Sequence, residues 1–495
     1  MFITYNRILS YLLCLCLLIQ GCVPTLPKNQ NHPKEEITTP EHFPNYGQKN
    51  LNTDNLNIVQ TNPDSTKKEN PLEKNWKVFF KDSQLVALIE TALKNNQELN
   101  ILNQEINIAN NEIMARQGEY IPKLGIGAGY EYEKVGEFTS RGKSDEIADV
   151  PEKLHNRQLG LTASWEVDIW KKLRNFAKSA YYEYLASVEG RNFAVTKLVA
   201  EIAGDYYELM ALDNQLEIIE QYIGTLKQAQ QVVKLQQIAA RTTSLAVKRF
   251  SAEVLKNQSR EYEIRQKIIV TENHLNTLLG RLPQPIKRTP EQFTKIELQN
   301  IDSGIPAALL DNRPDIKQSS LKLEAAKLDV KAVKTQFYPS LSIDAAIGYK
   351  SFNAHHLLDT PTSLFYNIAG GLTAPLLNRK AIKAEYFSAN NRQIQAIYNY
   401  EQTFIKAFAE VSNQMASVDN LKQIYKLKSG QTKAMAESVD ISNVLFKAAR
   451  IDYLEALLTQ RDYLEAQIEL IEVKQRQLYA YVNLYRTLGG GWQES

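Results

Sequence analysis

The stretch from Val195 to Leu226 reads VTKLVAEIAGDYYELMALDNQLEIIEQYIGTL, and its apolar residues recur every three or four positions. This spacing places them along one side of a helix as a continuous seam, which is typical of a coiled coil. Residues 152–282 contain no proline, so no ring interrupts the backbone hydrogen bonds of such a helix. The pattern predicts a helix over about residues 171–238, roughly 100 Å long at about 1.5 Å per residue.

Four other segments abandon the helical period and alternate apolar residues with small or polar ones. Each run is about as long as a tilted strand that crosses a membrane, with one apolar and one polar face. A soluble antiparallel sheet would give the same alternation, so that alternative stays open at this point. The four segments are Leu124–Tyr132, Leu159–Val167, Leu341–Tyr349 and Tyr366–Ala374.

The chain also repeats itself at an interval close to 210 residues. Gly160-Leu161-Thr162-Ala163 recurs 211 residues later, and Ala239-Ala240-Arg241 recurs 209 residues later as Ala448-Ala449-Arg450. Asn96-Gln97-Glu98-Leu99 corresponds to Arg313-Pro314-Asp315-Ile316 at an offset of 217. We therefore predict a mainly α chain with a small β part, in which each repeat runs helix, strand, strand, helix, helix.

These observations divide the chain into six parts. The segment 22–70 is rich in proline, Asn, Lys, Thr and Glu, and cannot bury enough apolar surface to order itself. The parts are a signal peptide (1–21), a flexible lipidated tether (22–70), a first repeat (71–282), a linker (283–305), a second repeat (306–490) and a tail (491–495).

The N-terminus reads as an export signal. Arg7 precedes a nearly unbroken apolar run from Ile8 to Ile19, which is too short to span a bilayer as a stable helix. The run ends in Gly21-Cys22, which resembles a bacterial lipobox whose cysteine carries lipid after cleavage. An ordinary secretory signal with an incidental cysteine is the alternative. The other two cysteines lie in the removed part, so no disulfide framework is possible in the mature chain.

The composition argues against several classes of protein. A net charge of +2, with 58 basic and 56 acidic residues, lacks the basic excess of a nucleic-acid binder. No catalytic constellation stands out, so an enzyme is not expected. The 5 methionines are scattered, and the adjacent His355 and His356 fit an exposed loop better than a metal site. We expect no metal and no cofactor beyond the covalent lipid on Cys22.

Five motifs in order carry a family resemblance. Trp76 and the apolar residues that follow it open the first repeat, and LDNRPDI (310–316) opens the second. FYPSL (337–341), DYLEA (452–456) and LGGGW (488–492) follow. Together they resemble the TolC-type outer-membrane factors, specifically the NodT-type lipoproteins that serve RND-type tripartite efflux pumps. The chain departs from that family where Ala449 replaces its usual glycine and where Pro375 is followed by Leu376-Leu377-Asn378.

The resemblance implies a homotrimer in the outer membrane, with four strands per copy in one 12-stranded barrel and a long periplasmic α-barrel. A periplasmic adaptor and an inner-membrane RND-type pump would feed it, and small toxic solutes or drugs would leave through it. Two other functions stay open: the exit duct of an ATP-driven protein-secretion system, and a structural coiled-coil lipoprotein. The sequence does not identify the exported substrates, because in such systems the pump usually selects them and not the duct.

The resemblance and the repeats suggest sites at the turns between long helices. Acids at the start of the last helix would form a ring at a constriction in a trimer, although acids also favour a helix start for electrostatic reasons. The candidate gate residues are Asp452, Glu455 and Arg450. The candidate adaptor-docking residues are Ala240, Arg241, Ala449 and Arg450.

Four aromatic residues are candidate anchors at the membrane interface. Their rings are suited to headgroup depth, although ordinary packing between helix and strand is the alternative. They are Tyr130, Trp165, Trp170 and Tyr349.

Overall fold

A computed structural model describes residues 23–26, 76–298, 312–375, 379–448 and 450–492. The signal peptide, Cys22, nearly all of the tether and Ala449 lie outside the described residues. By contacts, the chain forms two compact units, and each unit draws on both sequence repeats. We call the described parts of Met1–Glu35, Ile106–Ser187 and Ser319–Tyr400 the strand unit, and the remainder the helix unit.

The first repeat contains two strands and the first pair of long helices. Its described elements are α2 (Trp76–Phe79), α3 (Ser83–Asn95), α4 (Gln97–Glu119), β1 (Lys123–Lys134), α5 (Ser140–Ile147), β2 (Lys153–Val167), α6 (Lys172–Ile238) and α7 (Ser244–Leu278). The helix predicted over about 171–238 is confirmed as α6. The short α5 in the loop between β1 and β2 was not predicted.

The second repeat follows the same order after η3 (Pro290–Lys295), which lies in the predicted linker. Its described elements are α9 (Pro314–Lys334), η4 (Thr335–Phe337), β3 (Ser340–Ser351), η5 (Ala354–His356), β4 (Leu364–Thr373), α10 (Lys380–Lys447) and α11 (Tyr453–Thr487). Helices α7 and α11 both have 35 residues, as the 209-residue offset requires. The predicted mainly α fold with four strands is confirmed.

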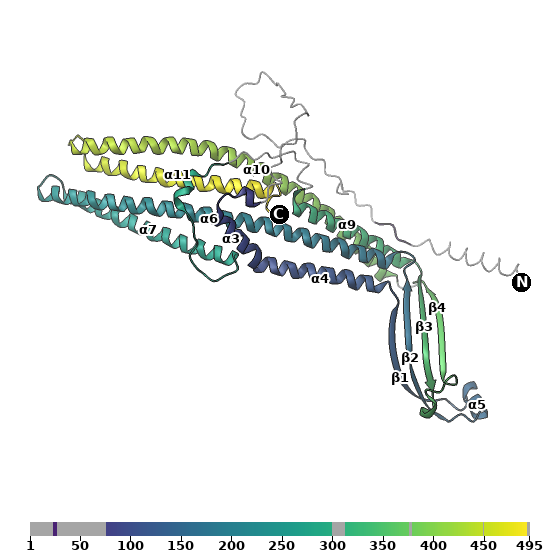
Figure 1. The fold of residues 1–495 in the computed structure, drawn as a ribbon. Coiled ribbons are helices and arrows are strands. Elements are labelled where there is room, and N and C mark those ends of the chain that lie inside the picture. Colours follow the sequence, from purple (N-terminus) through teal and green to yellow (C-terminus); the bar gives the residue numbers. More distant parts are fainter. Residues whose placement is uncertain (1–22, 27–75, 299–311, 376–378, 449, 493–495) are drawn as a thin grey trace, which may run out of the picture. The chain divides into compact units, whose positions relative to one another are not determined.

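The four strands form one antiparallel sheet in the order β1-β2-β3-β4 (Figure 1). The register is unbroken, so residues alternate strictly between two faces. One face is mainly apolar, with His155 and Arg157 near its loop end, and one of its cross-strand rows runs from Ile126 through Leu161 and Ile347 to Tyr366. These four side chains are 78%, 58%, 52% and 81% exposed in the single chain. A face of this kind suits contact with lipid.

The opposite face of the sheet is polar or small. One of its rows runs through Gly127, Gly160 and Gly348 to Phe365. A Cβ on Gly160 would lie 2.6 Å from the Ile347 carbonyl oxygen, and one on Gly348 would lie 2.3 Å from that of Leu159. Because β2 and β3 approach so closely here, only glycine fits at these two positions.

The predicted coiled-coil seam forms much of the core in the helix unit. Ile202, Tyr206, Leu209, Ile219 and Leu226 are all 0% exposed. Each buried Leu or Ile contributes about 1.5–3 kcal/mol to the free energy of unfolding. Figure 1 shows the hairpins α6/α7 and α10/α11 running beside each other with their turns at the same end of this unit. No described helix is both long and apolar enough to cross a membrane.

One side chain breaks the opening helix of the first repeat into α3 and α4. Asn96 has an extended backbone (φ −62°, ψ 127°), and its Oδ1 accepts a hydrogen bond from the Leu99 N–H at 3.0 Å. Its Nδ2 donates to the Leu278 carbonyl oxygen at the end of α7, at 2.9 Å. We expected a single helix here, and the break arises because Asn96 both starts α4 and ties it to α7.

Arg313 holds the corresponding position in the second repeat. Its guanidinium donates to the Thr487 carbonyl oxygen at the end of α11, at 2.9 Å. It also binds both carboxylate oxygens of Asp315, at 3.0 and 2.7 Å, and one oxygen of Glu410, at 3.0 Å. Arg313 is only 3% exposed, so the R-P-D part of the motif is a buried ionic latch.

A glycine stands beside each of these latches. Gly280 has φ +68° and Gly489 has φ +89°, and both follow the end of a long helix. A Cβ on Gly280 would lie 2.4 Å from the Asn95 carbonyl oxygen, and one on Gly489 would lie 2.6 Å from that of Asn312. Gly280 and Gly489, 209 residues apart, therefore make the same close contact with Asn95 and Asn312, which are 217 residues apart.

Candidate functional site

The four candidate anchors lie at two levels of the sheet. Trp165 stands near the end of β2 that leads into the helices, and Trp170 follows three residues after that strand. Tyr130 and Tyr349 stand near the opposite, loop end of β1 and β3. Tyr130, Trp165 and Tyr349 share the apolar face, and their role as membrane-interface anchors stays a prediction.

These aromatic residues also pack within the chain. Trp165 Nε1 donates to the Tyr120 carbonyl oxygen at 3.1 Å, and Trp170 Nε1 donates to that of Pro339 at 2.8 Å. The Tyr130 hydroxyl lies 2.7 Å from Nδ1 of His155. The polar ends of the rings are thus satisfied, while the Trp170 side chain stays 46% exposed. The anchor role and the packing alternative are compatible.

The first hairpin turn ends α6 in a tight hydrogen-bonded motif. The Ala240 N–H donates to the Gln237 carbonyl oxygen at 3.0 Å, and the Arg241 N–H donates to that of Gln236 at 2.8 Å. Ala240 has φ +55°, a left-handed conformation that glycine adopts more easily. The side chains of Ala240 and Arg241 are exposed, as a docking site requires.

The second hairpin turn ends α10 in a similar way. The Arg450 N–H donates to the Leu445 carbonyl oxygen at 2.9 Å, which corresponds to the Arg241 bond at an offset of 209. Arg450 is exposed. Both turns therefore present an arginine just past a helix end, and the docking role of these residues stays a prediction.

The candidate gate acids begin α11. Asp452 caps the helix, and its Oδ1 accepts hydrogen bonds from the N–H groups of Leu454 and Glu455 at 2.7 and 3.0 Å. Glu455 lies in the first turn and is exposed. In the part of the chain that the structure describes, no ion pair joins either acid to Arg450. In a single copy, Asp452 therefore acts as a helix cap, as the alternative predicted. The gate role stays a prediction.

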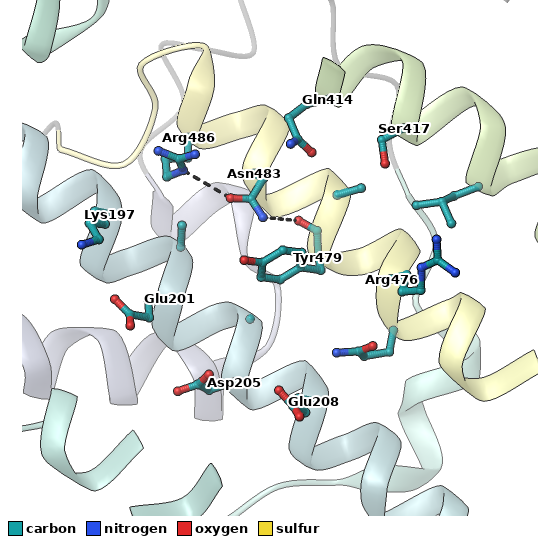
Figure 2. A pocket seen from close by; sticks show the side chains of 15 residues that line it. Lys197, Glu201, Asp205, Glu208, Gln414, Ser417, Arg476, Tyr479, Asn483 and Arg486 are labelled. Carbon is teal, nitrogen blue, oxygen red and sulfur yellow. Dashed lines mark hydrogen bonds between the residues drawn. The ribbon is translucent and has the colours of Figure 1, made fainter. Parts of the chain in front are cut away.

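A groove of about 720 Å³ in the helix unit was not predicted (Figure 2). Glu201, Asp205 and Glu208 line it from α6, at helical spacing along one face. Arg476 and Arg486 line it from α11, so the two walls carry opposite charge. The spacing of the three acids was visible in the sequence, but the basic wall comes from a distant segment.

His274 of α7 binds two of these acids. Its Nδ1 lies 2.6 Å from Asp205 Oδ2, and its Nε2 lies 3.7 Å from Glu201 Oε1. Burial raises the pKa of Asp205 to about 6, and the contact with His274 opposes that rise. The contact therefore joins α6 to α7 through a carboxyl group, Asp205, whose pKa lies well above its usual value.

The residues after Cys22 contact the strand unit. Val23 and Leu26 pack against an apolar cluster that includes Phe337 and Tyr386. Cys22 itself lies outside the described residues, so its lipidation stays a prediction. Its neighbour Val23 is nevertheless held beside the helices that adjoin the strands.

Histidines and acids form no metal site in the described ranges, where no group of three or more His, Cys, Asp or Glu could hold an ion. His355 and His356 lie in η5 and are exposed, which confirms the prediction of a loop pair. His356 pairs with Asp359, at 2.6 Å between Nδ1 and Oδ2.

Known outer membrane proteins resemble this chain over most of its length. A family model described as outer membrane efflux protein matches residues 88–281 and 305–490. The pyoverdine export outer membrane protein OpmQ of Pseudomonas aeruginosa is 26% identical over 418 residues, which cover 84% of this chain and 87% of that protein. The probable outer membrane lipoprotein SilC of Salmonella typhimurium is 24% identical over 477 residues, which cover 96% and 97%.

A solved structure has the same fold. The open state of the Neisseria gonorrhoeae MtrE outer membrane channel matches with a TM-score of 0.78 at 22% identity. The match covers 95% of this chain and 99% of that one.

Proposed function

This chain belongs to the outer membrane efflux protein family, whose members are channels and not enzymes, and from that premise we propose that three copies assemble into one export duct. The main observation behind this proposal is the sheet, on whose mainly apolar face large side chains of all four strands are exposed, including Ile126, Leu161 and Tyr366. In the described chain, β1 and β4 each pair with one strand only. Unpaired backbone groups cannot remain in hydrocarbon, so β4 of one copy pairs with β1 of the next until the sheet closes.

The polar face of the sheet then lines a wet lumen. It carries Glu131, Asp344, Lys350 and Asn367 between glycines and other small residues. Such a lining passes soluble molecules and binds none of them tightly. The name of the relative OpmQ assigns pyoverdine export to that protein, which supports small organic solutes as the cargo class here.

The duct works with a periplasmic adaptor and an inner-membrane RND-type pump. The exposed turns at Ala240-Arg241 and Arg450 form its lower rim, where the adaptor docks. Asp452 and Glu455 stand next to that rim and form a ring of acids in the trimer. Replacing both acids with alanine should raise the conductance of the isolated duct or change its cation preference. Unchanged conductance and selectivity would leave Asp452 as a helix cap only.

Cys22 carries the lipid that anchors the mature N-terminus. The packing of Val23 and Leu26 in the strand unit supports this, because Val23 directly follows Cys22 in the sequence. The intact mass of protein extracted from membranes tests it. A mature mass that begins elsewhere, with no acyl addition, would overturn the assignment. Cys22→Ser should abolish the acyl mass and leave the trimer intact, because the strands themselves enter the membrane.

Planar-bilayer conductance of the purified full chain, with native mass spectrometry in detergent, tests the duct itself. We expect a trimer mass and stable ion conductance. A stable monomer, or a trimer that never conducts, would contradict the proposal. A structural stalk gives no conductance, so the same measurement separates the two functions.

A further inference from the structure

The two long helices α6 and α10 begin with an unusual charge pattern. Each starts a few residues after a strand, and neither has an acidic residue in its first turn. Lys171 and Lys172 stand at the start of α6, and Arg379 and Lys380 stand at the start of α10. Basic residues are disfavoured at a helix N-terminus, because the helix dipole is positive there. At α6 a negative partner lies within the chain, because the Asp168 carboxylate accepts hydrogen bonds from the N–H groups of Leu173 and Arg174 at 3.0 Å. The lysines that remain without an acidic partner are therefore the ones to consider.

Several of these cations have no acidic partner. Lys172 pairs with Glu166, but Lys171 and Lys380 are exposed and form no ion pair with any described residue. Lys334, at the end of α9 and just before β3, is likewise exposed and without an ion pair in the described chain. Lys383 is exposed, and its Nζ lies 5.3 Å from the centre of the Phe387 ring. We call Lys171, Lys334, Lys380 and Lys383 the basic collar.

The collar lies where the lipid-facing surface ends. Val167, the last residue of β2, is paired with Leu341 on the apolar face, and Lys171 follows four residues later. Thr373, the last residue of β4, is paired with Ser340, which directly follows the loop after Lys334. The collar therefore stands at the depth where hydrocarbon gives way to headgroups. Trp170, with its exposed ring 5.1 Å from that of Tyr338, lies at the same level.

A second observation shows which side of the helices faces lipid. Val23 and Leu26 pack against a cluster that includes Phe387, and Lys383 lies over that same ring. If Cys22 carries lipid, its acyl chains enter the bilayer beside Val23. On the proposed lipidation of Cys22, the surface that holds Lys383 lies close to the membrane.

At the opposite end of the sheet, two basic residues have acidic partners, while Lys153 and Lys350 are exposed and form no ion pair with any described residue. There Arg141 pairs with Glu133 at 2.7 Å, and Lys134 pairs with Glu152.

We propose that the basic collar binds the phosphate groups of anionic phospholipids in the leaflet that faces the periplasm. The proposal rests on the proposed function, because it requires the strands to cross the membrane. Lysine binds phosphate as a point charge with three donors, which suits a fluid layer of headgroups. Each lysine near an anionic surface strengthens binding about fivefold, so several act together as a selective electrostatic collar.

Native mass spectrometry of the full chain in mild detergent tests the collar, with phosphatidylglycerol as the anionic probe and phosphatidylcholine as the neutral one. The variant carries Lys171→Gln, Lys380→Gln and Lys383→Gln. We expect roughly a hundredfold weaker retention of phosphatidylglycerol, from about fivefold for each lysine, and no change for phosphatidylcholine. The matched control carries Lys227→Gln, Lys234→Gln and Lys248→Gln on α6 and α7, with the same change in charge, and should retain lipid as the wild type does.

Several outcomes would overturn the proposal. One is retention of phosphatidylglycerol by the collar variant at the wild-type level, and another is equal loss in the control. A triple Lys→Arg variant at the collar positions keeps the charge and should retain phosphatidylglycerol, so loss of that lipid there would show a structural effect instead. Raising the salt from about 0.1 to about 0.5 M should release the lipid from the wild type. Wild-type conductance reports the duct separately, so failure of the collar is distinguishable from failure of the duct.

Discussion

The two repeats fasten their long helices with the same geometry and different chemistry. In the first, Asn96 ties the start of α4 to the end of α7 with one neutral hydrogen bond. In the second, Arg313 ties the start of α9 to the end of α11, and two carboxylates neutralise its charge. The backbone arrangement has been kept while the side chains have diverged. Equivalent positions should therefore respond alike to backbone changes and differently to side-chain changes.

The latches should show the largest difference. Arg313→Ala leaves the partly buried Asp315 without its partner, so we expect a loss of about 3–5 kcal/mol in the free energy of unfolding. Asn96→Ala removes neutral bonds only and should cost about 1–2 kcal/mol. Thermal denaturation of the detergent-solubilised protein ranks the two. An equal or larger effect in Asn96→Ala would refute the distinction between an ionic and a neutral latch.

The glycines beside the latches should respond alike. Gly280→Ala and Gly489→Ala both force a Cβ into a left-handed conformation and toward a carbonyl oxygen within 2.6 Å. We expect about 2–4 kcal/mol of destabilisation from each, from strain and overpacking together. Gly118→Ala is the matched control, because a Cβ there meets nothing within 4 Å. A large effect at only one of the two latch glycines would mean that the repeats are not equivalent here.

The contact between α6 and α7 should make the first hairpin sensitive to pH in a way that the second hairpin does not share at the equivalent positions. At the 209-residue offset, Gln414 and Asn483 replace Asp205 and His274, and neither titrates. Because the pKa of Asp205 is raised to about 6 in the folded chain, the folded state binds its proton more tightly than the unfolded state does. The stability from this group is present below about pH 4 and is lost as the pH rises through about 6.

Asp205→Asn should therefore flatten the decline in melting temperature between about pH 4 and 7. The matched change Gln414→Glu places an acid in the second repeat and should introduce such a decline. A melting profile of Asp205→Asn that falls as steeply as the wild type would exclude Asp205 as its source.

The helix caps at the rim should give the smallest effects. Asp452 accepts two backbone hydrogen bonds, whereas Thr243, at the corresponding position before α7, accepts none from its helix. Asp452→Ala should cost about 1 kcal/mol, and Thr243→Ala should cost much less. Thr243→Asp should stabilise the first hairpin by up to about 1 kcal/mol. Denaturant unfolding measures the free energy of unfolding of both alanine variants. Equal losses would show that Asp452 caps its helix no better than Thr243 does.

The sequence predicted the elements whose signals are local and periodic. The seam around Ile202 and Tyr206 gave α6, and strict alternation around Ile126 and Ile347 gave the strands. The acid at Asp452 also followed a local rule, because helix starts favour such a cap. In each case the physical cause lies within a few residues of the signal.

The missed features depend on residues that are far apart along the chain. Asn96 and Leu278 are 182 residues apart, and Arg313 and Thr487 are 174 residues apart. No short-range pattern predicts such bonds. The repeat offsets show only that Asn96 and Arg313 hold equivalent positions. His274 reaches Asp205 across 69 residues, so the local pattern of α6 could not predict this contact.

The order of strands in the sheet also determines when the membrane part of each copy can form. β1 with β2, and β3 with β4, are neighbours in sequence, so each pair can associate as soon as it has been exported. β2 pairs with β3 only after α6, α7 and α9 have emerged between them. Contacts this distant along a chain form late and slowly. Until the two hairpins join, a full copy exposes four open strand edges, and only the joined sheet leaves the two edges, β1 and β4, that its neighbours can accept.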